Sequence, residues 1–258
     1  MDIVKLGWSG GKDSTCAFLK HIERGDKVKA VCYIPMLTKE IPLILKKHHE
    51  FILKTADYFR SLGADVYITS GITYYEYVTH IAKSGKFKGQ MFGFPCITPG
   101  QCGFNRDSKS KAVRQVDVGH YDYESIAVAD DEVNRHGQLN ESKRSILCEL
   151  KITEARAAEI DDANNLLSPL YTVYGLKRDG CALCPKASEK ERRIWFNDYP
   201  EAVPVVLELQ RIVKAHRPER VPLRGSQWFI QEGNMEEIFK IQIPGQVSLL
   251  DELEEENK

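Results

Sequence analysis

The sequence contains no long hydrophobic run. It has no stretch of about 18 consecutive apolar residues, which is the length that a membrane-spanning helix needs. Its first residues lead directly into a predicted strand, without the charged, apolar and small-residue succession of a signal peptide. From these two absences we expect a cytoplasmic protein with no membrane partner.

Charge of either sign is not in excess, because the formal net charge is −1. No overall field therefore draws the chain toward nucleic acid, and any such binding must come from a local patch. The sequence also has no internal repeat and no low-complexity linker. Its 258 residues, of which 42% are hydrophobic, are enough for one large domain with a small extension.

A glycine pair stands between a short apolar run, residues 3–8, and a helical pattern that begins near Thr15. Because glycine has no Cβ, the backbone can turn sharply here and bring its N–H groups close to an anion. The start of the following helix adds unpaired N–H donors and the positive end of the helix dipole. The pattern therefore predicts a phosphate-binding loop formed by Ser9, Gly10, Gly11, Lys12, Asp13 and Ser14.

The side chains of this loop fit the same prediction. Ser9 and Ser14 offer hydroxyl donors, and Lys12 offers a cation. Asp13 suits a phosphate site if it holds a divalent ion such as Mg²⁺. The alternative is an ordinary glycine-rich turn between a strand and a helix, in which Asp13 serves as the helix cap.

The loop is not a Walker motif, which has four residues between its glycines and ends in Gly-Lys-Ser/Thr. It resembles the SGGxDS/T loop of the ATP pyrophosphatases, also called PP-loop or adenine nucleotide alpha-hydrolase-like proteins. The resemblance implies that ATP is bound with Mg²⁺ and cleaved between its α- and β-phosphates, with release of pyrophosphate. Lys12 and Asp13 would then be the catalytic residues of this chain.

Strand-like and helical patterns alternate along the chain, which predicts an α/β fold built on an open parallel sheet with helices on both faces. The resemblance implies the Rossmann-like arrangement of its family, and we expect a helical C-terminal extension. Strands are predicted at residues 3–8, 27–34, 65–69 and 125–129, an extended segment at 146–150, and helices at 41–62, 74–82, 108–116, 153–166, 188–196 and 202–216.

The ligand of such an open sheet lies beyond the carboxyl ends of its strands. The loop at residues 9–14 and the end of the second strand then surround one pocket. In the resembled family the backbone at this second position holds the adenine, which implies this role for Tyr33 and Ile34.

Four of the seven cysteines lie in predicted loops rich in glycine and proline. Cys181 and Cys184 form a Cys-x-x-Cys pair, a spacing that lets two sulfurs face one ion or cluster. Cys96 and Cys102 supply a second pair. Four loop thiols in a cytoplasmic chain predict a [4Fe–4S] cluster or a zinc site. The alternatives for Cys181 and Cys184 are a redox-active dithiol or two small hydrophobic residues.

The remaining cysteines have a simpler interpretation. Cys16 lies in the first predicted helix, Cys32 in the second strand and Cys148 in an apolar run. A buried free cysteine behaves as a small hydrophobic residue, and this is what we expect of all three.

A second resemblance extends over most of residues 1–200. The segments 166–171 and 178–185, together with Ile152-Thr153-Glu154 and the acidic stretch Asp131-Glu132 followed by Arg135, resemble the PAPS reductase family in its broad sense. In cluster-bearing members a cysteine pair precedes a Cys-x-x-Cys pair by a separation similar to that between Cys102 and Cys181. The resemblance thus implies that Cys96, Cys102, Cys181 and Cys184 hold a cluster.

One absence distinguishes the branches of that family. Sulfonucleotide reductases carry a nucleophilic cysteine in a C-terminal tail and a degenerate phosphate loop, whereas this chain has no cysteine after Cys184 and keeps the full loop. Both features favour an enzyme that uses ATP and disfavour sulfonucleotide reduction. Among enzymes of the resembled superfamily that use ATP, the resemblance implies sulfur insertion. The alternatives are a phosphoadenosine phosphosulfate reductase and, from another class, a non-catalytic nucleotide-binding module.

The sequence therefore predicts an enzyme that adenylylates an acceptor and then thiolates it. We expect a PP-loop nucleotide-binding domain with the cysteine site over residues 1–185, and the helical extension over residues 186–258. The expected cofactors are ATP, Mg²⁺ and a [4Fe–4S] cluster or Zn²⁺. The expected partners are an acceptor such as tRNA or DNA, a sulfur-donor protein, and a second copy of the chain in a homo-oligomer.

Overall fold

The chain divides into two compact units, each formed by several segments of the sequence. The computed structural model describes residues 1–95, 102–178, 180–220, 222–223 and 228–230. Unit 1 is formed by residues 1–34, 47–69 and 112–179, and unit 2 by residues 35–46, 70–111 and the described part of 180–258. Among the described residues, no helix combines the length and the hydrophobicity that crossing a bilayer requires.

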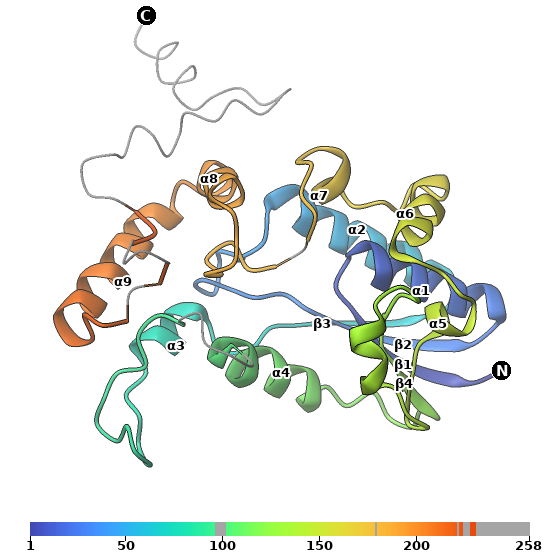
Figure 1. The fold of residues 1–258 in the computed structure, drawn as a ribbon, viewed down its shortest axis with the longest axis horizontal. Helices are drawn as coiled ribbons and strands as arrows, with labels where there is room; N and C mark the ends of the chain where they lie inside the picture. The colour runs from blue at the N-terminus through green and yellow to red at the C-terminus, as the bar shows by residue number, and fades with distance from the viewer. Residues whose placement is uncertain (96–101, 179, 221, 224–227, 231–258) are drawn as a thin grey trace, which may run out of the picture. The chain divides into compact units, whose positions relative to one another are not determined.

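Strands and helices alternate from the first residues onward, as Figure 1 shows. The order is β1 Ile3–Trp8, α1 Lys12–Arg24, β2 Lys27–Tyr33, α2 Lys46–Ser61, β3 Asp65–Thr69, α3 Tyr74–Thr79, a π-helical turn Asn105–Lys109, α4 Ser110–Gln115, β4 Tyr123–Ser125, a 3₁₀ turn Val133–Gln138, β5 Lys143–Arg144, α5 Ile146–Glu149, α6 Glu154–Ala163, α7 Pro169–Thr172, α8 Glu189–Asp198 and α9 Ala202–His216.

Unit 1 contains a five-stranded sheet in the order β3-β2-β1-β4-β5, and every strand pair is parallel. This confirms the predicted α/β fold with a parallel sheet. In the ladders Trp8 pairs with Cys32 and Tyr33 with Thr69, so these strands end at the same edge of the sheet. The first strand lies in the centre, which places the loop that follows it in the middle of the carboxyl edge.

Helices α1, α2 and α6 lie on the same side of the sheet in Figure 1. The rings of Phe18 on α1 and Phe59 on α2 stack with centroids 3.7 Å apart, and Trp8 packs edge-on against both. The indole N–H of Trp8 donates to Thr15 Oγ1 at 3.1 Å. Trp8 is therefore a core residue that joins the end of β1 to the first turn of α1.

A buried hydrogen-bond chain joins the other end of α1 to the sheet. His21 Nδ1 lies 2.8 Å from Asp26 Oδ2, and His21 Nε2 lies 2.8 Å from Ser125 Oγ on β4. The order Asp–His–Ser is that of a hydrolase triad. However, His21 and Ser125 are both 0% exposed, so no substrate reaches the serine. We interpret the chain as a structural tie between α1 and β4.

Unit 2 is built around aromatic rings and the helices α3, α8 and α9. Tyr74 packs edge-on against Phe104 with centroids 5.1 Å apart, and Trp195 donates its indole N–H to the carbonyl of Pro42 at 2.9 Å. A capping box begins α3, since Thr73 and Glu76 satisfy each other's backbone N–H groups. Tyr75 reaches α9 by donating to Glu208 at 2.9 Å.

Several local predictions are confirmed and others are wrong. The helix at 202–216 has the predicted ends, and Thr153 and Ser188 cap α6 and α8. Residues 41–45 were predicted to be helical, and this is wrong. Pro42 instead forms a β-bridge with Met36, and the N–H of Leu43 donates to the carbonyl of Pro35.

The segment 146–150 was expected to be extended, but it forms the short helix α5. Ser145 caps this helix by accepting from the N–H of Cys148. The fourth strand is also shorter and earlier than predicted, at Tyr123–Ser125 instead of 125–129. The division into residues 1–185 and 186–258 stays a prediction.

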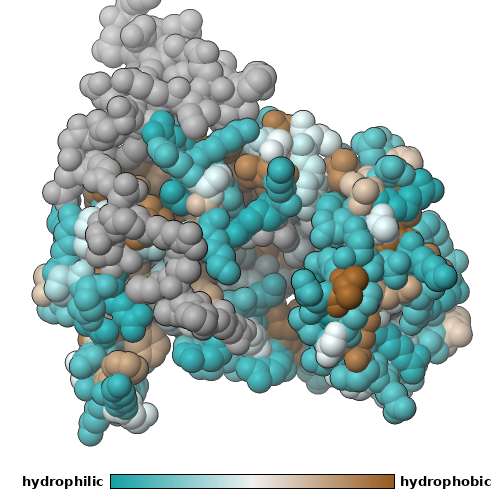
Figure 2. Space-filling model, in the orientation of Figure 1, coloured by the Kyte–Doolittle hydropathy of each residue, from teal (hydrophilic) through white to brown (hydrophobic). Residues whose placement is uncertain are grey.

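The surface in view is mostly hydrophilic. Figure 2 shows polar and charged residues over this face of the described chain, with hydrophobic residues in small groups between them. The exposed large apolar side chains are scattered in the sequence, with Val133 the most exposed after the N-terminal methionine. This face therefore offers no broad apolar surface for a partner.

Candidate functional site

The loop after β1 is held in a conformation that requires glycine. Gly10 has φ of 74°, and Gly11 is the extended N-cap residue of α1 with φ of −75° and ψ of 157°. A Cβ added to Gly10 would lie 2.6 Å from Ile52 Cγ1 and 3.0 Å from His48 Cε1. Both the dihedral angle and the space therefore exclude a side chain here.

The two serine hydroxyls order the loop from within. Ser9 Oγ and Ser14 Oγ lie 3.1 Å apart, and the N–H of Ser9 donates to Ser14 Oγ at 3.2 Å. Ser14 Oγ donates to the carbonyl of Gly11 at 3.0 Å. The N–H of Gly11 and the N–H of Lys12 have only long contacts of 3.3 Å, with Ser9 Oγ and Tyr171 Oη. An anion at the helix start would be a stronger acceptor for both N–H groups.

Lys12 lies between two carboxylates. Its Nζ is 3.1 Å from Asp13 Oδ2 and 3.0 Å from Glu154 Oε2, and Glu154 comes from the first turn of α6. Burial lowers the pKa of Lys12, but the hydrogen bonds and charges of Glu154 and Asp13 outweigh burial and raise it. Lys12 is therefore a cation held in place by two anions.

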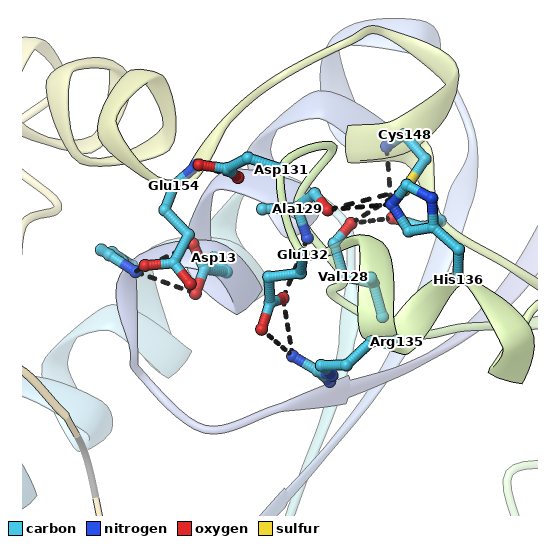
Figure 3. Close-up of polar contacts among 11 residues, drawn as sticks. Asp13, Val128, Ala129, Asp131, Glu132, Arg135, His136, Cys148 and Glu154 are labelled. Carbon is cyan, nitrogen blue, oxygen red and sulfur yellow. Dashed lines mark hydrogen bonds and ion pairs between the residues drawn. The ribbon is translucent and has the colours of Figure 1, made fainter.

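Further acidic side chains surround this pair of carboxylates, as Figure 3 shows. Glu154 donates its N–H to Asp131 Oδ1 at 2.9 Å, and Glu132 accepts from Arg135 Nη1 at 2.7 and 2.8 Å. Burial raises the pKa of Asp13, Lys12 lowers it, and the charges of Glu154 and Glu132 raise it again. The negative groups are close enough to influence one another, so a bare triphosphate would meet repulsion here.

Asp161 of α6 is the least expected member of this group. Its side chain is 0% exposed, and neither carboxyl oxygen has a hydrogen-bond partner. Burial raises the pKa of Asp161 to about 9, and the charge of Asp13 adds to the effect. At neutral pH this carboxyl is therefore protonated, and it could become a charged ligand only beside a cation.

A thiol and an imidazole lie together near the acidic stretch. Cys148 Sγ is 3.6 Å from His136 Nε2 and donates to the carbonyl of Val128 at 3.3 Å. In Figure 3 both side chains lie on the far side of Val128 and Ala129 from Asp13. Burial raises the pKa of the Cys148 thiol, so Cys148 is not an activated thiolate in this arrangement.

The two residues predicted to contact adenine, Tyr33 and Ile34, lie at the carboxyl edge of the sheet but differ in solvent exposure. Ile34 is buried, and its N–H already donates to the carbonyl of Thr69 at 2.9 Å. Tyr33 is half-buried at the last position of β2. The roles of Tyr33 and Ile34 in adenine binding stay predictions.

The predicted cysteine site lies in unit 2 and is only partly described. Cys96 lies outside the described residues. Burial raises the pKa of the Tyr74 phenol well above its usual value, and the nearby charges of Cys102, Cys181 and Cys184 add to this. Cys102, Cys181 and Cys184 therefore all lie within electrostatic range of this buried tyrosine.

The arrangement does not by itself demonstrate metal binding. Within the described ranges, no three His, Cys, Asp or Glu side chains are placed so that they could hold a metal ion. A hydrogen bond from the N–H of Cys184 to the carbonyl of Cys181, at 2.9 Å, closes the turn between these two residues. The residues described do not fit a cluster or zinc as they stand, so both stay predictions.

The other cysteines agree with their simpler interpretation in part. Cys16 and Cys32 are completely buried, and burial raises the pKa of Cys16 to about 12. Both are therefore unreactive core residues. Cys148 is only half-buried, on the short helix α5.

The chain matches none of the models of known protein families. It also has no significant match to a curated protein. The interpretation of the site therefore depends on its geometry and on the resemblance of its motifs.

The sequence led to the loop but missed several of the residues around it. Glu154 was noted only as part of a family motif, although it forms the second ion pair of Lys12. Tyr171 was noted only as part of the resembling segment 166–171, and Asp161 carried no signal, since an acid within a predicted helix is a common feature. Only the packing of α6 and α7 near α1 gives them a place beside residues 9–14.

Proposed function

We propose that this chain is an ATP pyrophosphatase that cleaves ATP to AMP and pyrophosphate and adenylylates an acceptor. The observation that supports it best is the loop at residues 9–14. It combines a left-handed Gly10 with no space for a side chain, an α-helix start, and Lys12 fixed between two carboxylates. An ordinary turn between a strand and a helix does not require this combination of three features.

In this proposal the backbone N–H groups at Gly10, Gly11 and Lys12 bind the β- and γ-phosphates at the positive end of α1. Ser9 and Ser14 keep the loop in shape through their mutual hydrogen bond. Lys12 offsets the charge that develops as the α–β bridging oxygen leaves with the pyrophosphate. An oxygen of the acceptor attacks the α-phosphorus and pyrophosphate leaves, which gives the adenylylated acceptor. A sulfur nucleophile then attacks the acceptor and displaces AMP. The protein acts by positioning and by charge stabilisation.

The residues present fit a magnesium ion. Mg²⁺ in nucleotide sites is held by one or two carboxylates together with phosphates and waters. Asp13 and Glu154 meet this requirement because the carboxylates of both contact the same atom, Lys12 Nζ, and therefore lie close to each other. When bound, Mg²⁺ would neutralise phosphate charge, and Asp13 with Glu154 would hold it.

The finer parts of the prediction belong to the same proposal. The Rossmann-like arrangement is supported by the strand order 3-2-1-4-5 with the loop at its centre. Thiolation of the adenylylated acceptor is supported by the motif resemblance and by Cys102, Cys181 and Cys184, which all lie within electrostatic range of Tyr74. A sulfur-donor protein, the helical C-terminal extension and a homo-oligomer complete the proposal. Iron and zinc analysis with an absorption spectrum after anaerobic purification tests the metal.

The decisive experiment separates the products of ATP. The full chain is incubated with Mg²⁺ and ATP labelled in the α-phosphate, alone and with total tRNA or plasmid DNA. We expect AMP and pyrophosphate from the wild type and a loss of at least about a hundredfold in Asp13→Asn and Lys12→Ala. The matched control is Lys20→Ala, which removes an exposed ion pair with Glu23 on the same helix.

Other product patterns would reject the proposal. ADP and phosphate would mean cleavage at the wrong bond. Sulfite formed from phosphoadenosine phosphosulfate with thioredoxin would favour the reductase. Nucleotide binding without turnover, changed only in affinity by Asp13→Asn, would favour the non-catalytic module.

A further inference from the structure

Unit 2 contains a pocket that plays no part in the nucleotide proposal. Its volume is about 640 Å³, which lies in the range of small-ligand sites. Its lining comes from three separate stretches of unit 2: residues 77–95, residues 103–106 and residues 217–220. The stretch 80–91 forms the long loop below α3 in Figure 1, and hydrophilic residues cover its tip in Figure 2.

The charge of this pocket is of one sign. Among the described residues, its lining includes five lysines or arginines and one histidine, and it includes no aspartate or glutamate. The five cations are Lys83, Lys86, Arg106, Arg217 and Arg220, and the histidine is His80. Asp107 and Glu219 pair with Arg106 and Arg217 from outside the lining. The walls of the pocket thus favour an anion with several charges.

Two of the pocket side chains are positioned by glycines. Gly103 leaves room for the phenol of Tyr77, because a Cβ there would lie 2.2 Å from Tyr77 Oη. Gly93 has φ of 68°, and its Cβ would lie 2.9 Å from Arg220 Cβ. Burial raises the pKa of Tyr77 to about 12, so its phenol stays a hydrogen-bond donor.

Arg217 is fixed by the backbone of the same loop. Its Nη1 donates to the carbonyl of Met91 at 2.7 Å and to Gln90 Oε1 at 3.3 Å, while its Nε pairs with Glu219. Its side chain is only 12% exposed. The guanidinium is therefore pre-organised at the wall of the pocket, which lowers the entropic cost of binding an anion.

Aromatic rings lie among these cations. Phe87 is 48% exposed and carries Lys86 Nζ 5.9 Å from its ring centre. Phe92 packs edge-on against Tyr77 and His80, with centroids 5.3 and 4.8 Å apart. Cations that follow a phosphate backbone, combined with rings on which bases stack, are the features of sites for single-stranded nucleic acid.

We propose that this pocket binds a single-stranded segment of nucleic acid, with the phosphates on the lysines and arginines and a base on Phe87. A peptide of aspartate and glutamate alone would meet the charges but has no ring to stack on Phe87. The inference rests on unit 2 alone and does not require the nucleotide loop to work.

Fluorescence anisotropy of the full chain with labelled 12-residue oligouridylate and oligodeoxythymidylate tests the proposal. We expect both to bind, with affinity that falls as salt rises. Lys83→Ala/Lys86→Ala should weaken binding about tenfold and reduce the salt slope by roughly 1.4, since each phosphate contact on a single strand contributes about 0.7. Phe87→Ala should weaken it about tenfold at unchanged slope.

The matched control is Lys39→Ala/Lys109→Ala, which removes two exposed charges of unit 2 that do not line the pocket. Equal loss in this control would overturn the proposal, because general charge would then explain binding. Absence of wild-type binding, or equal competition by polyglutamate with no effect of Phe87→Ala, would overturn it too. A preference for RNA or DNA identifies the source of the strand. Turnover of ATP is measured separately, so the two proposals fail independently.

Discussion

The loop of unit 1 and the pocket of unit 2 both suit phosphate groups, but their charges are opposite. Around the loop, one cation is surrounded by Asp13 and Glu154, with Glu132 nearby. The pocket has cations on its walls and no carboxylate among its described lining residues. The difference suggests two ways to bind a polyanion: one that needs a metal ion with the ligand, and one that binds the ligand directly.

The largest effect should come from the backbone of the loop. We expect Gly10→Ala to destabilise the fold by about 3 kcal/mol and to abolish nucleotide binding, since the new Cβ would combine a left-handed φ with a 2.6 Å contact. Gly7→Ala is the control, because its Cβ would meet nothing within 4 Å. Urea unfolding measures both. Equal stability of the two variants would show that the loop tolerates a side chain.

Removal of magnesium is the next strongest test and separates the two sites directly. We expect chelation by EDTA to weaken ATP binding at least about tenfold, because the carboxylates would then face unneutralised phosphates. Oligonucleotide binding at the pocket should not change. Calorimetric titration with ATP and anisotropy with the oligonucleotide give the two values. Equal loss at both sites would remove the distinction between them.

A milder test concerns the second carboxylate beside Lys12. We expect Glu154→Gln to reduce ATP turnover about tenfold and to make Lys12 more reactive toward an acylating reagent, since Glu154 raises the pKa of Lys12. Glu159→Gln on the same helix, where the native side chain pairs only with the exposed Arg156, is the control. Mass spectrometry measures the labelling of Lys12. Unchanged reactivity would mean that Glu154 does not hold the lysine.

The smallest effect should come from pH, acting on the frame of unit 1. Burial lowers the pKa of His21, so the folded state keeps this imidazole neutral. The unfolded chain takes up the proton near pH 6.5. Stability from this group is therefore full above that value and is lost as pH falls through it, with about 1 kcal/mol lost by pH 5.5.

Thermal melting of the wild type between pH 8 and pH 5 measures this dependence. His21→Gln should flatten the curve, whereas His120→Gln, at a side chain that is 74% exposed, should leave it unchanged. A wild-type curve that does not fall in this window would mean that His21 is charged in the fold.

The first strands and helices of unit 1 could be predicted because their signals are local. Glycines, the apolar run of β1 and the helical spacing after Asp13 all occur within the first 24 residues. The alternation that follows gave β2 and β3 within one residue of their observed ends. Such patterns report the choice between strand and helix directly.

The remaining features depend on contacts between distant parts of the chain. Glu154 reaches Lys12 across 142 residues, and the cations of the pocket come from three stretches that no sequence period connects. The short helix α5 was missed because an apolar run of this length reads equally well as a strand, and only the cap at Ser145 decides it. Residues 41–45 looked helical because their spacing continues into α2, while Pro42 starts a different structure.

The central position of β1 has a consequence for biosynthesis. β1 leaves the ribosome well before its partner β4 at residues 123–125, and the carboxylate of Glu154 follows later still. A nascent chain that ends before this point exposes one whole edge of β1, with Lys12 beside a single acid. Unit 1 thus gains its full set of strands and charges only after synthesis has passed Glu154, and a chaperone that covers that edge would act before then.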